Sequence, residues 1–93
     1  MFGSFIRHRR EELDLSLRHV ARLMGVSPTY LSKMERDKEE VGTFTEKRCR
    51  SLARILELDP DKLVLLAGRI PSDIHLRLCQ HPELIDEIRE RSA

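Results

Sequence analysis

A chain of 93 residues can form one small domain of five to seven short helices around a single core, and it is too short for a catalytic cleft between two lobes. Apolar residues make up 40% of the chain, charged residues 35% and aromatic residues only 4%, a composition that favours helices over strands. The net charge of +1 conceals a basic half and an acidic half, because residues 1–54 carry a net charge of +4 and residues 55–93 one of −3.

No motif of the sequence indicates a membrane span, a secretion signal or an enzyme. The longest apolar run, at residues 63–67, is far shorter than a bilayer requires, and the N-terminus lacks an apolar signal core. Glycine-rich phosphate loops, paired cysteine clusters and catalytic triads at plausible spacing are absent from the sequence. Cys49 and Cys79 lack metal-ligand spacing, so we expect reduced thiols in a cytoplasmic protein with no metal or cofactor.

The first helix is predicted over residues 2–13. Its apolar residues Phe2, Phe5, Ile6 and Leu13 recur at helical spacing and are expected on the face toward the core. Charged residues cover the rest of the surface, which makes this a scaffold helix.

The next stretch, residues 16–36, predicts two short helices joined by a tight turn. Ser16 is a good N-cap for the first helix, and Gly25 can adopt the positive φ that ends it. Ser27 is a second N-cap, with Pro28 at the first helical position, where its missing N–H has no cost. The residues expected to face inward recur at three- and four-residue spacing; they are Leu17, Val20, Ala21, Met24, Leu31 and Met34.

This stretch resembles the motif of the lambda-repressor/Cro-like helix-turn-helix regulators, also called the xenobiotic-response-element type. The resemblance lies in the small Ala21, the turn Gly25, the apolar Val26 and the phrase SPTYLSKMER at residues 27–36. It covers roughly the first two thirds of the chain. It implies an all-α fold with a five-helix lambda-repressor-like helix-turn-helix domain.

The resemblance also implies an ion pair and two unusual turns. In the family an arginine at the place of Arg10 pairs with the glutamate near the end of the recognition helix, here Glu35; the alternative is a solvated surface charge. Asp14 and Asp37 stand where a glycine commonly closes the first and third helices, although aspartate tolerates the left-handed conformation better than most residues.

The family places the second helix of the motif in the major groove of DNA. By this resemblance Thr29, Ser32 and Lys33 are expected to contact base edges, while Pro28 beside the Ser27 cap can offer only apolar contact. Tyr30 either contacts phosphate or packs beside Val26. The expected contacts to the sugar-phosphate backbone are Arg18, Tyr30, Arg36, Lys38, Gly42 and Thr43.

Two further helices complete the expected five-helix domain, at residues 1–68. Thr45 is a better N-cap than Thr43 for the fourth helix, and Cys49 is expected as a core thiol beside Leu52, Ala53 and Leu56. The fifth helix begins at Asp59 and Pro60 and ends at Gly68. Its apolar run is wider than one stripe, so this helix is either deeply buried or in contact with a partner.

Residues 69–93 are expected to form a C-terminal extension of two amphipathic helices, interrupted by His81 and Pro82. Such short helices are marginal alone, so they either pack back on their own core or form a homodimer interface. His75 and Cys79 could supply only half of a metal site. The residues expected at a dimer interface are Leu65, Ile70, Ile74, Leu78, Leu84, Ile85 and Ile88.

Together these features predict a sequence-specific DNA-binding regulator, a homodimeric repressor of its own operon that reads a palindromic operator with half-sites ~34 Å apart. In one alternative the chain is an antitoxin or a protease-controlled repressor whose C-terminal helices bind a toxin or a protease. In another it is an adaptor between proteins that never binds DNA, although the basic first half of the chain argues against this.

Overall fold

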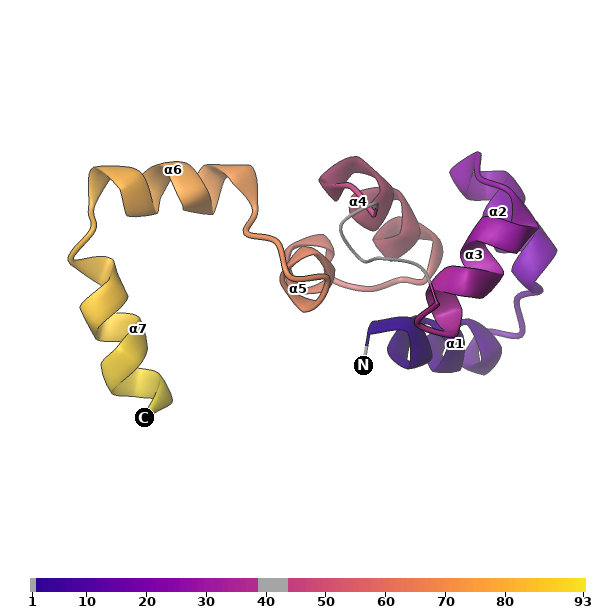
Figure 1. Cartoon of the computed structure of the whole chain (residues 1–93), viewed down its shortest axis with the longest axis horizontal. Helices are drawn as coiled ribbons and strands as arrows, with labels where there is room; N and C mark the ends of the chain where they lie inside the picture. Colours follow the sequence, from indigo (N-terminus) through magenta and orange to yellow (C-terminus); the bar gives the residue numbers. More distant parts are fainter. Residues whose placement is uncertain (1, 39–43) are drawn as a thin grey trace.

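The computed structural model describes residues 2–38 and 44–93, and within these ranges it contains seven helices and no strand. In chain order the helices are α1 (Phe2–Glu12), α2 (Leu17–Met24), α3 (Pro28–Glu35), α4 (Glu46–Ile55), α5 (Pro60–Leu66), α6 (Ser72–Gln80) and α7 (Leu84–Ser92) (Figure 1). The predicted all-α fold is confirmed, and each helix lies within one or two residues of its expected ends.

Four helices begin at the capping residues that the sequence indicates. Ser16, Ser27, Thr45 and Asp59 each accept a hydrogen bond from a backbone N–H two or three residues further on, at donor–acceptor distances of 2.9 to 3.2 Å. Such a bond satisfies one of the N–H groups that the first turn of a helix leaves without an intrahelical partner. Thr45 therefore caps α4, and the alternative cap Thr43 lies outside the described residues.

Three helices end at a residue other than glycine in the left-handed conformation. Asp14, Asp37 and Glu57 have φ values of 57°, 56° and 55°. Asp14 and Asp37 therefore adopt the conformation of the glycine that commonly stands in their place, which costs about 1 kcal/mol each. At Asp37 a tertiary contact offsets this cost, because its Oδ1 accepts a hydrogen bond from the backbone N–H of Gly3 at 3.1 Å.

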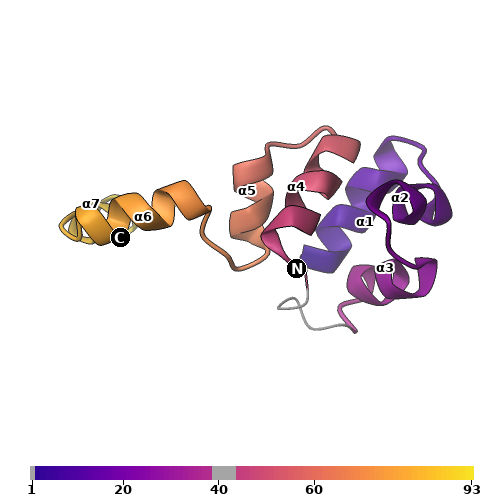
Figure 2. The ribbon, with the colours of Figure 1, turned by 90° about the horizontal axis from the view of Figure 1, so that it is seen from above.

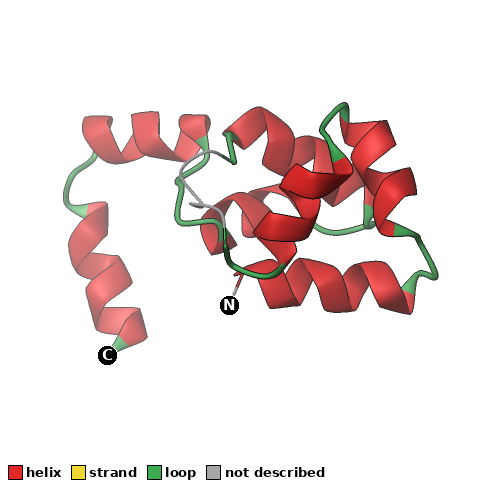
Figure 3. Cartoon of the chain, turned by 45° about the vertical axis from the view of Figure 1, so that its right-hand side comes forward, coloured by secondary structure: helices red, strands yellow, loops and turns green. Residues whose placement is uncertain are grey.

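Helices α1 to α5 pack into one unit, which we call the body (Figure 2 and Figure 3). Its buried apolar side chains form a single cluster that draws on all five helices and on Phe44, the residue before the Thr45 cap. The members of this core are Phe2, Ile6, Val20, Ala21, Leu31, Met34, Phe44, Cys49, Leu52, Ala53, Leu56, Leu63, Val64 and Ala67.

The prediction that Phe5 faces the core is wrong, because 43% of its surface is exposed. The buried residues of α1 are Phe2, Gly3 and Ile6, and Arg10 continues the same line one turn after Ile6. At about 100° per residue, this face is centred between Phe2 and Gly3, and Phe5 lies roughly a third of a turn to its side. Because Gly3 is buried, the buried face of α1 differs from the face on which its large apolar residues lie.

Helices α6 and α7 extend away from the body, and we call them the arm (residues 72–92) (Figure 1 and Figure 2). Neither helix has a buried residue. The alternative in which these helices pack back on their own core is therefore wrong. The molecule is elongated as a result, with extents of 44 × 24 × 24 Å. Among the described residues, no helix has the length and apolar character that crossing a membrane requires.

Candidate nucleic-acid interface

Helices α2 and α3 and the turn between them lie at the end of the body farthest from the arm (Figure 2). The turn is closed by Gly25, whose φ is 74°, and by a hydrogen bond from the N–H of Val26 to the carbonyl of Ala21 at 3.0 Å. Ala21 is fully buried, which allows the two helices to approach closely. The arrangement is a helix, a tight turn and a second helix with one free face.

Helix α3 divides its residues between the core and the outside. Leu31, Met34 and Glu35 are buried. Ser32 and Tyr30 are partly exposed. The predicted contact residues that are exposed on or beside this helix are Ser27, Pro28, Thr29, Lys33, Arg36 and Lys38. The three residues expected to contact bases, Thr29, Ser32 and Lys33, thus share the side of α3 that does not pack on the body.

A buried ion pair holds the inner side of α3 to α1. Nε and Nη2 of Arg10 donate to the two carboxylate oxygens of Glu35 at 2.7 and 2.9 Å, and Nη1 donates to the carbonyl of Leu15 at 2.8 Å. Only 13% of the Arg10 side chain and 5% of the Glu35 side chain are exposed. The hydrogen bond to Glu35 raises the pKa of Arg10 above its ordinary value. The structure therefore contains the expected pair in a bidentate geometry, which fixes both position and orientation.

A second contact joins α1 to the end of α3. The backbone of Gly3 lies against α3 so closely that a Cβ atom would overlap the carbonyl oxygens of Met34 and Glu35 and the carboxylate of Asp37. Any side chain at this position would push the two helices apart. Together with the ion pair, this contact makes α1 the support on which α3 rests.

Tyr30 packs into the body rather than projecting freely. Its ring is parallel to that of Phe44, with the centroids 6.3 Å apart, and the Arg48 guanidinium lies 5.1 Å from its centroid. Nη1 of Arg48 also donates to the Tyr30 hydroxyl at 3.3 Å. The partner that the structure shows for this ring is therefore Phe44. Arg48, which is eighteen residues from Tyr30 in the chain, brings a cation to the start of α3 that sequence reasoning missed.

Other cations surround the motif. A hollow beside the turn of the motif is lined by Lys47, Arg48 and Arg54 of α4, and a second hollow at the start of α2 is lined by Arg18 and Arg22. Except for Arg18, these residues were not among the expected contacts, because their positions depend on how α2 and α4 pack together. Gly42 and Thr43, expected at the sugar-phosphate backbone, lie outside the described residues.

Nothing in the described part of the chain resembles a metal centre. Sγ of Cys79 lies 3.9 Å from Nδ1 of His75, but no group of three or more histidine, cysteine or acidic residues gathers among the described residues. Cys49 is fully buried, and the loss of solvation raises the pKa of its thiol to about 11. It is a core residue, as predicted.

Comparison with known proteins identifies the class. The model of the helix-turn-helix domain family matches residues 1–66, and the chain belongs to this family. The resemblance inferred from the motif is therefore confirmed, and the chain is a DNA-binding regulator of the helix-turn-helix type.

Two solved structures resemble the chain over nearly its whole length. The crystal structure of the clp gene regulator ClgR from Corynebacterium glutamicum is 26% identical, with a TM-score of 0.60 over 98% of this chain and 88% of that chain. A chain of the SinR protein/SinI protein complex is 22% identical, with a TM-score of 0.60 over 99% of this chain and 98% of that chain. No curated protein sequence matches the chain.

Proposed function

We propose that this protein is a homodimeric repressor of its own operon, which acts in the cytoplasm and reads a palindromic operator with one α3 helix per half-site. Residues 1–68 would be its DNA-binding domain and residues 69–93 its dimerisation segment. The observation that carries the proposal is the division of α3, which presents Thr29 and Lys33 outward and is held from behind by the buried Arg10–Glu35 pair.

Each exposed residue of the interface has a role that its chemistry supports. Lys33 can donate to O6 or N7 of guanine, and the hydroxyl and methyl groups of Thr29 suit several base edges. The half-buried Ser32 lies one turn after Pro28, where it can contact a base or a phosphate. The side chains around α3 that are suited to phosphate contacts are four basic residues and one tyrosine hydroxyl. They are Arg18, Arg36, Lys38, and Arg48 with its hydrogen-bond partner Tyr30.

The dimer is supported by apolar surface that the monomer leaves in water. Leu65, Ile70, Ile74, Ile85 and Ile88 are 41–54% exposed, and Leu78 and Leu84 are partly exposed. A monomer with this many exposed apolar residues in and beside its arm is expected to have a partner. A second copy of the chain offers the same surface, as a two-fold dimer requires.

The proposal is tested by selecting a binding sequence from random duplex DNA and measuring affinity for it by fluorescence anisotropy across a salt series. The wild type should prefer the selected duplex to a scrambled one. Lys33→Ala should weaken specific binding by about tenfold and relax the choice of base at one position, because one base contact is worth roughly 1–3 kcal/mol. The matched control is Lys62→Ala on α5, which removes the same charge far from α3 and should leave the preference intact.

Dimerisation is tested by analytical ultracentrifugation of the wild type and of Ile74→Asp combined with Ile88→Asp. The wild type should sediment as a dimer and the variant as a folded monomer, because both residues are exposed in the isolated chain. In the anisotropy experiment, one outcome would contradict the proposal. The wild type would bind the selected and the scrambled duplex with equal affinity, and modest salt would abolish both interactions, as expected for non-specific counterion release alone.

A second candidate function assigns the same apolar surface to a different protein, such as a toxin or a protease. The net charge of −3 in residues 55–93 and the likeness to a chain from a complex of two different proteins, SinR and SinI, favour it. This candidate would be supported if the wild type sediments as a monomer, even at high concentration, and also remains a monomer on the selected duplex.

A further inference from the structure

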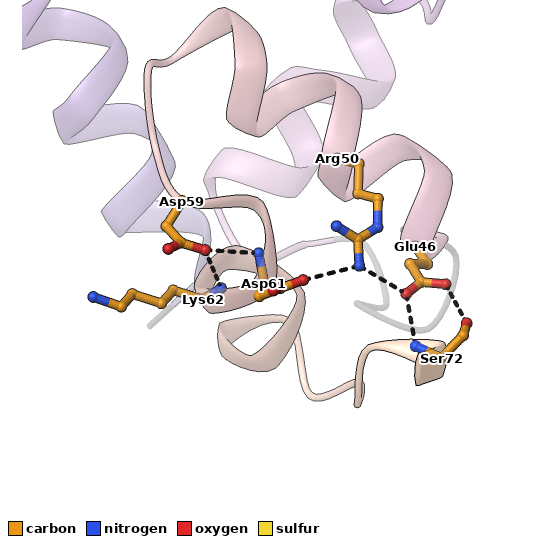
Figure 4. Close-up of polar contacts among 6 residues, drawn as sticks. All are labelled: Glu46, Arg50, Asp59, Asp61, Lys62 and Ser72. Atoms are coloured by element: carbon orange, nitrogen blue, oxygen red, sulfur yellow. Dashed lines mark hydrogen bonds and ion pairs between the residues drawn. The ribbon is translucent and has the colours of Figure 1, made fainter. Parts of the chain in front are cut away.

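The segment between α5 and α6 is attached to the start of α4 by polar contacts. The hydroxyl of Ser72 donates to Oε2 of Glu46 at 2.7 Å, and the backbone N–H of Ser72 donates to Oε1 at 3.1 Å (Figure 4). Nη2 of Arg50 donates to the same Oε1 at 3.3 Å and to Oδ1 of Asp61 at 3.0 Å. The Glu46 carboxylate on α4 therefore binds the start of α6 directly and is linked to α5 through Arg50.

Glu46 also supplies the cap that α6 lacks. The residue before α6 is Pro71, which has no side-chain acceptor and makes no capping hydrogen bond. The Glu46 carboxylate accepts from the first N–H of α6 instead, and its negative charge lies at the favourable end of the helix dipole. A residue of the body thereby performs a role that normally belongs to the local sequence of the helix.

A second attachment lies three residues earlier in the chain. Nε of Arg69 donates to the carbonyl of Phe44 at 3.0 Å, and Pro71 is fully buried between the two attachments. Phe44 is the residue whose ring stacks on Tyr30 at the start of α3. The connection to the arm is thus fixed on the same residue that supports the reading helix.

These contacts decide the direction of the arm, because α6 and α7 have no buried residues that would hold them in place. Helix α6 contains nine residues and is about 13 Å long. Tilting it by about 15° at Ser72 would move its far end by about 3.5 Å, which is close to the ~3.4 Å rise of one base pair. In a dimer joined through the arms, such a tilt changes the separation of the two α3 helices.

We propose that Glu46 is the positioning residue that sets the half-site spacing of the operator, by fixing the arm to the body through Ser72. This proposal rests on the proposed homodimer. With Glu46 and Ser72 joined, the two α3 helices are held at one separation, and an operator of any other spacing has to be deformed before both half-sites can be occupied. Without that contact, the two bodies can each adjust and accept several spacings.

The test uses the duplex selected by the wild type and versions of it with one or two base pairs inserted or removed at the centre. Affinities of the full-length wild type, Glu46→Gln and Ser72→Ala are measured for each duplex. The wild type should lose affinity about tenfold or more for one inserted base pair, whereas both variants should lose about threefold or less. Ser72→Thr keeps the hydroxyl and the N–H, and it should restore the selectivity of the wild type.

A second measurement reports on the arm without DNA. A spin label on Arg7→Cys in a Cys79→Ser background places one label on the exposed side of α1 in each body, because Cys49 is fully buried. Pulsed electron resonance then gives the distance between the two bodies of a dimer. Glu46→Gln should broaden this distance distribution at least about twofold, whereas the matched change Glu12→Gln, which breaks the pair of the half-exposed Glu12 with Arg9 on α1, should leave it unchanged.

The outcomes separate this proposal from the one on which it rests. A dimer in which both variants keep the spacing selectivity and the narrow distance distribution of the wild type overturns the role of Glu46 and leaves the repressor intact. A wild type that is monomeric on the selected duplex overturns the dimer and this proposal together. A dimer with relaxed spacing in Glu46→Gln and Ser72→Ala, and normal spacing in Ser72→Thr, supports both.

Discussion

Helices α4 and α6 have nearly the same length, ten and nine residues, but different parts of the molecule stabilise them. Helix α4 carries its own cap at Thr45 and buries Cys49, Leu52 and Ala53. Helix α6 has no side-chain cap of its own and no buried residue. The comparison extends to the whole body and the whole arm: the body holds its helices by packing, whereas the arm has no buried residue and is attached to the body through the contact of Ser72 with Glu46.

The largest difference is expected from the same substitution made in the two regions. Leu52→Ala removes a side chain that is 1% exposed and should lower the free energy of unfolding by about 2–5 kcal/mol. Leu76→Ala removes one that is 57% exposed and should lower it by less than about 0.5 kcal/mol. Urea denaturation followed by circular dichroism, on dilute protein, gives both values. Equal losses would mean that the arm packs as tightly as the body.

A smaller effect is expected from the ion pairs of the body. Arg10→Ala leaves the buried Glu35 carboxylate without its partner and should cost about 3 kcal/mol. Arg7→Ala breaks the pair between Arg7 and Glu11, whose side chains are more than half exposed, and should cost less than about 0.5 kcal/mol. The same denaturation measurement applies. If Arg10→Ala were as stable as the wild type, the pair would not support α3.

The reactivity of the two cysteine thiols should differ between the body and the arm, and this can be measured on the wild-type chain. Cys79 of the arm is exposed, whereas Cys49 of the body is fully buried and its thiol pKa is raised to about 11. Because the thiolate is the reactive form, one thiol per chain should react with a colorimetric disulfide reagent at pH 8, and the second only after unfolding. Reaction of both thiols at similar rates in the folded chain would show that the core around Cys49 opens readily.

The smallest expected effect is the pH dependence of the contact between Glu46 of the body and Ser72 of the arm. The hydrogen bonds from Ser72 hold the pKa of Glu46 below its ordinary value. A carboxyl group with a lowered pKa stabilises the contact above its ordinary pKa, and this contribution is lost as the pH falls through the lowered value. The Ser72 amide signal in nuclear magnetic resonance should therefore change with a midpoint below the ordinary value of 4.5 for glutamate. In Ser72→Ala, the Glu46 carboxyl signal should titrate closer to that value.

Features that depend on nearby residues in the chain could be predicted from the sequence. The caps at Ser16, Ser27, Thr45 and Asp59 each act over two or three residues, and all four are present in the structure. The helix ends at Gly25 and Gly68 follow from a similar local signal, whereas the left-handed conformation of Glu57 after α4 has no such signal in the sequence. The fold class and the exposed face of α3 follow from such signals together with the resemblance to a family.

Contacts between distant residues could not be predicted in the same way. The sequence predicts Phe5 in the core because periodicity cannot reveal that the backbone of Gly3 packs against the end of α3. The contact of Arg48 with Tyr30 and the contact of Glu46 with Ser72 join residues 18 and 26 positions apart. Such pairs depend on the angles at which helices cross, and no local pattern encodes those angles.

The stacking of Tyr30 on Phe44 has a practical consequence for spectroscopy. The sequence contains one tyrosine and no tryptophan, so the intrinsic near-ultraviolet emission of the chain is dominated by a single ring at the start of α3. That ring is in contact with the ring of Phe44 and with the Arg48 guanidinium. Any ligand that draws Arg48 away from Tyr30 should alter the emission, which gives the unlabelled protein its own optical reporter of what occupies this face.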